Sequence, residues 1–145
     1  MTMNTFIKNK NYLISSKKRC NKHRKRILDI SQRVRALHAA GAFSALEMVD
    51  TIYYKLMKKN HKKKFIDTFL MSKGHGCMSQ YVVLESLGIF PKNYLDTYCT
   101  KNGKLGCHPD YGIPGIEAST GSLGHGMGLA VGMAHADFIN KKNTK

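Results

Sequence analysis

The chain has 145 residues, 42% of them hydrophobic and 23% charged, which is enough for one packed core of ordinary domain size. Lysine and arginine outnumber aspartate and glutamate by 24 to 9, a formal net charge of +15 that permits contact with phosphate groups. No stretch reaches the ~20 apolar residues of a membrane span, and the start lacks the apolar core of a secretory signal peptide. None of the four cysteines has CxxC spacing, so no zinc or thioredoxin-type site is indicated, and we expect a cytoplasmic protein with reduced thiols.

The first segment of the chain is strongly basic. Nine lysines and arginines lie within residues 1–26, where no acidic residue occurs. We therefore expect residues 1–24 to form a flexible basic arm and residues 25–145 to form one domain. A second basic run, KKNHKKK, covers residues 58–64. Neither run carries a recognisable nucleic-acid module, so we favour a solvated tail and a solvated loop over a nucleic-acid-binding module.

Helical spacing begins after this arm. Ile27, Ile30, Val34 and Leu37 share one face of a predicted helix, which Gly41 can end. The next predicted helix carries an apolar stripe from Leu46 to Leu56 and starts at a capping box formed by Ser44 and Glu47. Two helices therefore precede the Lys-rich run.

A short apolar run, TFLMS, follows at residues 68–72 and predicts a buried strand that leads into a tight KGHG turn. Residues 77–86 are typical of a helix, with Gly88 as its C-terminal cap. Residues 90–98 predict another helix, with Pro91 at its first position. After a loop over residues 101–119, a last helix is predicted for residues 122–140. This order indicates an α/β fold that is helix-rich and has few parallel strands.

Three histidines occupy positions where a side chain could act on a ligand. His75 lies between two glycines at the predicted carboxyl end of a strand, where open α/β sheets bind ligands. His108 lies in a loop made rigid by the following proline, and His38 stands at the break between two helices. An imidazole in such places can donate to a phosphate or transfer a proton. A structural role for each histidine stays open on these grounds.

Residues 112–134, GIPGIEASTGSLGHGMGLAVGMA, hold seven of the chain's thirteen glycines. The N-terminus of the helix predicted here could offer unpaired N–H groups to an anion. Gly124, Gly128 and Gly132 are four residues apart, so they share one helix face and predict a groove for close packing against a neighbour. Both functions can coexist, one at the start of the helix and one along it.

Taken in order, three segments resemble the N-terminal part of the transketolase family. LHAAGAFSALEMVDTIYY is similar to the family's GHxGGSxS segment, and MSKGHG is similar to its SxGH segment. CHPDYGIPGIEASTGSLGHGMGLAVGMA resembles GHPE…PGxExxTGxLGxGxxxAxGxA closely. The agreement covers about residues 27–140, and TGSLGHG looks more like the shorter, two-subunit transketolases than the long single-chain ones.

The resemblance implies a partial thiamine-diphosphate-binding fold and the transfer of a two-carbon ketol unit between sugar phosphates, with thiamine diphosphate and Mg²⁺ as cofactors. It implies that His38 and His108 are catalytic residues that face the substrate. It implies that the cofactor-binding residues are His75, Gly121, Ser122 and Leu123.

The departures from the family pattern define what we expect to be missing. LHAAG stands in place of GHxGG around His38, and CHPD in place of GHPE around His108. The family's GDG…N segment, which holds the metal, would follow the last helix, so we expect no metal ligand in this chain. We expect the family's pyrimidine domain to be missing too. We therefore expect a fragment that is inactive alone and joins the remainder of the enzyme or a C-terminal subunit in a homo- or hetero-oligomer. The alternative is a degenerate half-domain that acts only as an assembly partner.

Overall fold

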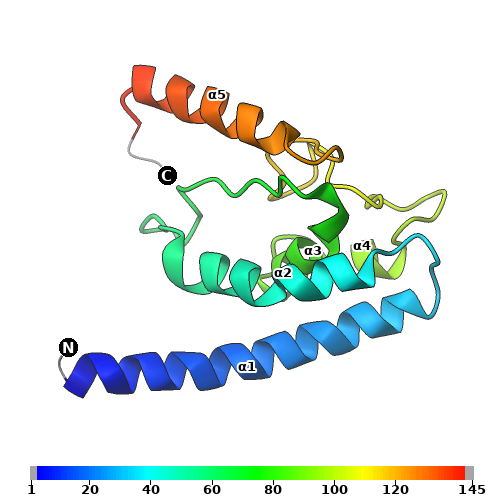
Figure 1. Ribbon diagram of the computed structural model, residues 1–145, viewed down its shortest axis with the longest axis horizontal. Helices are drawn as coiled ribbons and strands as arrows, with labels where there is room; N and C mark the ends of the chain where they lie inside the picture. Colours follow the sequence, from blue (N-terminus) through cyan, green and yellow to red (C-terminus); the bar gives the residue numbers. More distant parts are fainter. Residues whose placement is uncertain (1–2, 143–145) are drawn as a thin grey trace.

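The computed structural model describes residues 3–142 and is built from helices joined by irregular segments. α1 (Met3–Ser31) lies along one edge of the molecule, with α2 and α3 beside it and α5 on the far side (Figure 1). The remaining elements follow in chain order: α2 (Ala39–Thr51), a π-helical turn η1 (Ile52–Leu56), a 3₁₀ turn η2 (Gly74–Gly76), α3 (Cys77–Ser86), α4 (Asn93–Asp96) and α5 (His125–Ile139).

Residues 3–24 form most of α1, and the structure therefore differs from the flexible basic arm that we expected. The reason is a buried stripe at helical spacing, which begins well before Ile27 and packs α1 against α2 and α3. Its first members are small or polar side chains, which hydrophobic periodicity does not detect. The stripe consists of Ser16, Cys20, His23, Ile27 and Ile30. The division into domains at residue 25 stays a prediction.

A buried carboxylate fixes α1 to α2. Asp50 is fully buried, and the Ser16 hydroxyl donates to its Oδ2 across 2.5 Å. The Arg19 guanidinium donates to both oxygens of Asp50, from Nε at 2.8 Å and from Nη2 at 2.9 Å. The same guanidinium lies 4.0 Å from the centre of the Tyr54 ring. The charge of Asp50 is thus matched by a two-bonded arginine in a nearly closed environment.

The boundary between the first two helices differs from the prediction. α1 ends at Ser31, ahead of Gly41, and α2 begins at Ala39 with His38 in its N-cap position. Ser44 lies inside α2, where its hydroxyl donates to the Gly41 carbonyl at 2.9 Å, so the predicted capping box is wrong. A serine three residues before a glutamate is also compatible with a helix interior, where the hydroxyl bonds back to the preceding turn.

The later helices agree better with the sequence. The helix predicted for residues 77–86 is confirmed as α3, and Gly88 ends it with a positive φ of 70° and an N–H bond to the Glu85 carbonyl. α4 is shorter than predicted and begins two residues after Pro91, at Asn93. α5 starts at His125, three residues later than predicted, because Gly124 precedes it in a left-handed conformation with φ 93°.

The predicted strand at residues 68–72 is absent. Among residues 3–142 the structure contains no strand, only an isolated antiparallel bridge between Lys59 and Phe65. The expected parallel strands of the α/β fold are therefore not confirmed. A strand needs a neighbour to complete its hydrogen bonds, and residues 68–72 run as an irregular segment between α2 and α5 (Figure 1).

α5 lies apart from the other helices and approaches the rest of the chain at its first turn. A Cβ on Gly126 would lie 2.5 Å from Ser72 Cα, so the two backbones touch there. By contrast, nothing lies within 4 Å of a Cβ placed on Gly128 or Gly132, so the predicted glycine groove packs against no part of residues 3–142. Several apolar side chains of α5 face outward, including Met127 (73% exposed), Val131 (68%) and Phe138 (79%). No helix in the described residues is long and apolar enough to cross a membrane.

Candidate functional site

The structure brings together the three histidines that were singled out in the sequence. His75 lies between the other two, with its ring centre 4.8 Å from that of His38 and 4.7 Å from that of His108. The His38 and His108 rings are 6.2 Å apart. His38 is exposed at the start of α2, whereas His75 on η2 and His108 in the loop before α5 are half-buried. Three imidazoles from three separate segments therefore open on one corner of the molecule.

Glycines allow these segments to approach so closely. A Cβ on Gly74 would lie 2.6 Å from the Thr120 carbonyl oxygen and 2.9 Å from Gly121 Cα, so no other residue fits without movement of the backbone. A Cβ on Gly41 would lie 3.3 Å from the His75 carbonyl oxygen. The turn that carries His75 is thus held between α2 and the residues before α5.

Hydrogen bonds hold the loop of His108 in place. The Thr120 hydroxyl donates to the Met71 carbonyl at 2.6 Å, and the Thr120 N–H donates to the Pro109 carbonyl at 3.2 Å. From α3, the phenol of the fully buried Tyr81 donates to the His108 carbonyl at 2.8 Å. The sequence analysis missed Thr120 and Tyr81 as positioning residues. Thr120 could have been suspected because it stands directly before Gly121, but Tyr81 reads as an ordinary aromatic core residue.

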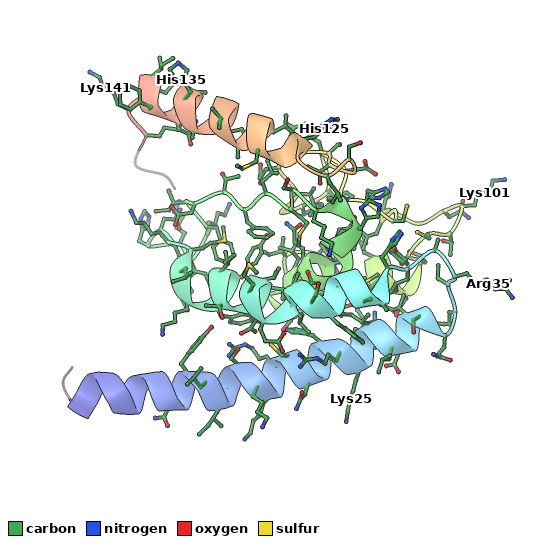
Figure 2. The ribbon with its side chains drawn as sticks, viewed as in Figure 1. Lys25, Arg35, Lys101, His125, His135 and Lys141 are labelled. Atoms are coloured by element: carbon green, nitrogen blue, oxygen red, sulfur yellow. The ribbon has the colours of Figure 1, made fainter. Side chains whose placement is uncertain are left out.

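The proposed cofactor wall is only partly assembled around the histidines. Gly121 presents its Cα to the His108 ring, because a Cβ there would lie 3.7 Å from the ring's Cγ. Ser122 and Leu123 are exposed on the turn before α5, and no hydrogen bond joins them to the histidines in the part of the chain described. A surface groove lined by Thr120, Gly121 and residues of α5 begins beside this turn. His125 marks the start of α5 (Figure 2).

The environment of the cluster keeps its central histidine neutral. Desolvation, followed by the nearby His108, His38 and Lys73, lowers the pKa of His75 below its ordinary value. The Nε2 atom of His108 is buried and has no hydrogen-bond partner among the described residues. Its Nδ1 lies 3.6 Å from the Cys107 sulfur. A buried nitrogen without a partner is uncommon in proteins and marks a position where a bound group could complete a hydrogen bond.

No group of three or more histidine, cysteine, aspartate or glutamate side chains within residues 3–142 is arranged to hold a metal ion. The carboxylates near the cluster are few, and Asp110 lies exposed at the surface. Mg²⁺ prefers carboxylate oxygens and phosphate as ligands. That its protein ligands lie outside this chain stays a prediction.

Comparison with known proteins places these observations in one family. Residues 15–144 match the family described as "Transketolase, thiamine diphosphate binding domain". The chain is 37% identical over 127 residues to one subunit of the apulose-4-phosphate transketolase of Phocaeicola vulgatus, covering 86% of this chain and 45% of that protein. It is 35% identical over 115 residues to the transketolase of Aquifex aeolicus, covering 76% of this chain and 17% of that protein.

A solved structure gives the same result. The transketolase from Leishmania mexicana superposes with a TM-score of 0.75 at 30% identity, over 84% of this chain and 19% of that one. The chain thus spans less than half the length of these relatives. The sequence match, the shared fold and the order of the three histidine segments agree, and the chain belongs to the transketolase family, within its thiamine-diphosphate-binding domain.

Proposed function

We propose that this chain is the N-terminal portion of a thiamine-diphosphate-dependent transketolase, which transfers a two-carbon ketol unit between sugar phosphates. The observation that carries the proposal is the convergence of His38, His75 and His108 from three separate segments. Imidazoles grouped in this way can donate and accept protons on the hydroxyl and carbonyl oxygens of a sugar.

Two features of the corner fit a bound thiamine diphosphate. The buried Nε2 of His108 has no partner among the described residues, and Gly121 carries no side chain beside the His108 ring, where one would hinder a close approach. His75, Gly121, Ser122 and Leu123 are the residues that would hold the cofactor. When bound, it would supply a carbon nucleophile and an electron sink for breaking the ketose carbon–carbon bond.

The chain's own contribution is orientation and proton transfer. Tyr81 donates to the His108 carbonyl and Thr120 donates to the Pro109 carbonyl, so the backbone that carries the His108 ring is held in place. The lowered pKa of His75 leaves the ring neutral at neutral pH, where one nitrogen accepts a proton and the other donates. His38 is exposed at the start of α2, on the side from which a substrate would enter.

We also propose that a further polypeptide completes the site with the Mg²⁺ ligands and a pyrimidine-binding surface. The part of the chain that the structure describes offers no metal cluster, and one side of the histidine corner faces outward. The relative from Phocaeicola vulgatus is itself named as a subunit. The exposed apolar side chains of α5 are consistent with a partner surface.

Calorimetry and turnover together test the proposal. Thiamine diphosphate with Mg²⁺ should bind weakly or not at all to the chain alone, whereas the complex with its co-purified partner should bind the cofactor and transfer ketol units. Changing His75 or His108 to glutamine should lower kcat of the complex by about 100-fold or more. His61→Gln, in the exposed Lys-rich run after η1, is the matched control and should change kcat less than about twofold.

Two results would contradict parts of this assignment. Tight binding of the cofactor by the chain alone would overturn the claim that the site is incomplete. A stable complex in which an intact partner is present but no ketol transfer occurs would favour the alternative, a half-domain that serves only assembly.

A further inference from the structure

A second groove lies away from the histidine corner, between α1, α3 and the turn that follows α3. It shares no lining residue with the histidine cluster. α1 contributes Lys22, His23 and Lys25 to its wall, and the turn contributes Phe90 and Lys92. The transketolase site described above makes no use of this groove.

His23 has an unsatisfied nitrogen at this groove. The residue is only 3% exposed, and its Nε2 is buried without a hydrogen-bond partner among the described residues. Burial lowers its pKa to about 4, against the opposing effect of Asp50 on α2 and with smaller contributions from Arg19 and Lys22 on α1. The ring is therefore neutral at neutral pH. Nearly all buried polar groups in folded proteins have a partner, so the free nitrogen points to a ligand that supplies one.

The charge along the groove is positive once internal ion pairs are removed. Arg26 and Glu85 neutralise each other through bonds of 2.9 and 3.2 Å, and Arg26 also holds Asp96 at 2.8 Å. Lys22 and Lys25 are exposed, and neither side chain forms a hydrogen bond or ion pair within the described side chains. Lys25 lines the edge of the groove, and its side chain projects outward from α1 into solvent (Figure 2).

With Lys92 across the groove, three lysines face one carboxylate outside these ion pairs, that of Asp29. Charges at a concave rim attract an anion more strongly than isolated surface charges do.

The floor of the groove is apolar. Ile89 is half-buried and supplies the accessible apolar surface, and it rests on Val82 and Phe90, which are 1% and 3% exposed. A cationic rim above an apolar floor fits a ligand with one anionic group and one hydrophobic part. Inorganic ions would use only the rim, and neutral hydrocarbons only the floor.

We propose that this groove is a binding site for a small organic phosphate, held by Lys22, Lys25 and Lys92 through its phosphate and by the Ile89 side chain of the floor through its apolar part. His23 supplies a neutral hydrogen-bonding group below the rim. The lysines contribute charge and the floor contributes burial, so both halves of the ligand are required for tight binding.

Phenyl phosphate is the probe that separates this site from the sugar-phosphate site, because it carries no sugar. Titrated into the full chain and followed by ¹H–¹⁵N chemical shifts, it should bind with a Kd below about 1 mM and shift residues of α1, α3 and the 88–92 turn. Inorganic phosphate and phenol, the two halves of the probe, should each bind at least about fivefold more weakly.

Paired variants test which charges hold the phosphate. The double change Lys22→Ala and Lys25→Ala should weaken binding of phenyl phosphate by about tenfold. The control removes the same charge from the same helix outside the groove, with Lys17→Ala and Lys18→Ala, and should weaken binding less than about twofold. All four lysines are exposed, so circular dichroism should show an unchanged fold in both variants.

His23→Phe adds an independent measurement, since it keeps a ring of similar shape but removes both nitrogens, and it should also weaken binding. Several outcomes would overturn the proposal: no binding of phenyl phosphate at about 10 mM, equal weakening by the two lysine pairs, inorganic phosphate that binds as tightly as the ester, or shifts confined to the surroundings of His38, His75 and His108.

Discussion

The junction of α1 with α2 differs from the helix α5 in how its side chains are partnered. At the junction, Asp50 is fully buried and bonded by Ser16 and Arg19, so even its polar groups are matched internally. On α5 the apolar residues Met127, Val131 and Phe138 remain more than two-thirds exposed. A helix that is apolar around most of its surface is normally buried. The comparison indicates that the junction of α1 with α2 is satisfied internally, whereas α5 is shaped to meet another surface.

The strongest way to break the first half of this comparison is to remove the buried charge. Asp50→Ala leaves the guanidinium of Arg19 largely buried without a carboxylate, and it should lower the free energy of unfolding by about 3 kcal/mol. Urea denaturation measures the change. Glu47→Ala breaks the exposed pair with Arg24 and should cost less than about 1 kcal/mol. Similar losses for the two variants would show that Asp50 is not the anchor of α1.

Glycines offer the next largest contrast. Gly74→Ala places a Cβ against the Thr120 carbonyl and should lower the free energy of unfolding by about 2 kcal/mol. Gly128→Ala places a Cβ in open space inside α5 and should raise it by about 0.5–1 kcal/mol, because alanine is the better helix former. Thermal unfolding should show a lower melting temperature for Gly74→Ala and a higher one for Gly128→Ala. A destabilised Gly128→Ala variant would mean that α5 is already covered in the isolated chain.

The pH dependence of stability tests the burial of His23. Its folded-state pKa of about 4 lies below the ordinary 6.5, so the unfolded chain binds this proton first as the pH falls. The free energy of unfolding should therefore decrease between about pH 6.5 and 4, by about 2 kcal/mol from this residue. The difference between wild type and His23→Phe isolates that share, since His75 titrates in both. Parallel pH profiles would show that His23 is accessible to protons when folded.

The smallest expected effect on stability concerns the exposed face of α5. Val131→Lys combined with Phe138→Lys should change the free energy of unfolding by less than about 0.5 kcal/mol, because both side chains already lie in solvent. Because this face is apolar, we expect the isolated chain to self-associate at increasing concentration in sedimentation velocity, and the double variant should reduce that association. A loss of more than about 1 kcal/mol would place these side chains in the core instead.

The site was more predictable from the sequence than the fold. Each of the three histidines stands in a short segment with its own glycines or proline, and the order of these segments matched a family pattern. The sequence could not show that Tyr81 holds the His108 carbonyl, because a tyrosine in an apolar helix looks like any core aromatic. Nor could it show the close contact at Gly74, which depends on a segment 46 residues later in the chain.

The errors in the fold have two physical causes. The packed part of α1 was missed because Ser16, Cys20 and His23 are buried although they are small or polar, so hydrophobic periodicity does not detect them. The strand at residues 68–72 was predicted because its apolar run suits a buried strand, but local sequence does not supply the neighbour that a strand must pair with. Within residues 3–142 that neighbour is missing.

The segment before η2, residues 68–72, determines how a further strand could pair with this molecule. Its carboxyl end is already fixed, because the Met71 carbonyl accepts the Thr120 hydroxyl and Ser72 is covered by Gly126. The carboxyl end of this segment is therefore already positioned before any other strand pairs with it. Since a shift of one residue would turn every side chain of a strand to the opposite face, Thr120 and Gly126 together set the register for any strand added beside residues 68–71.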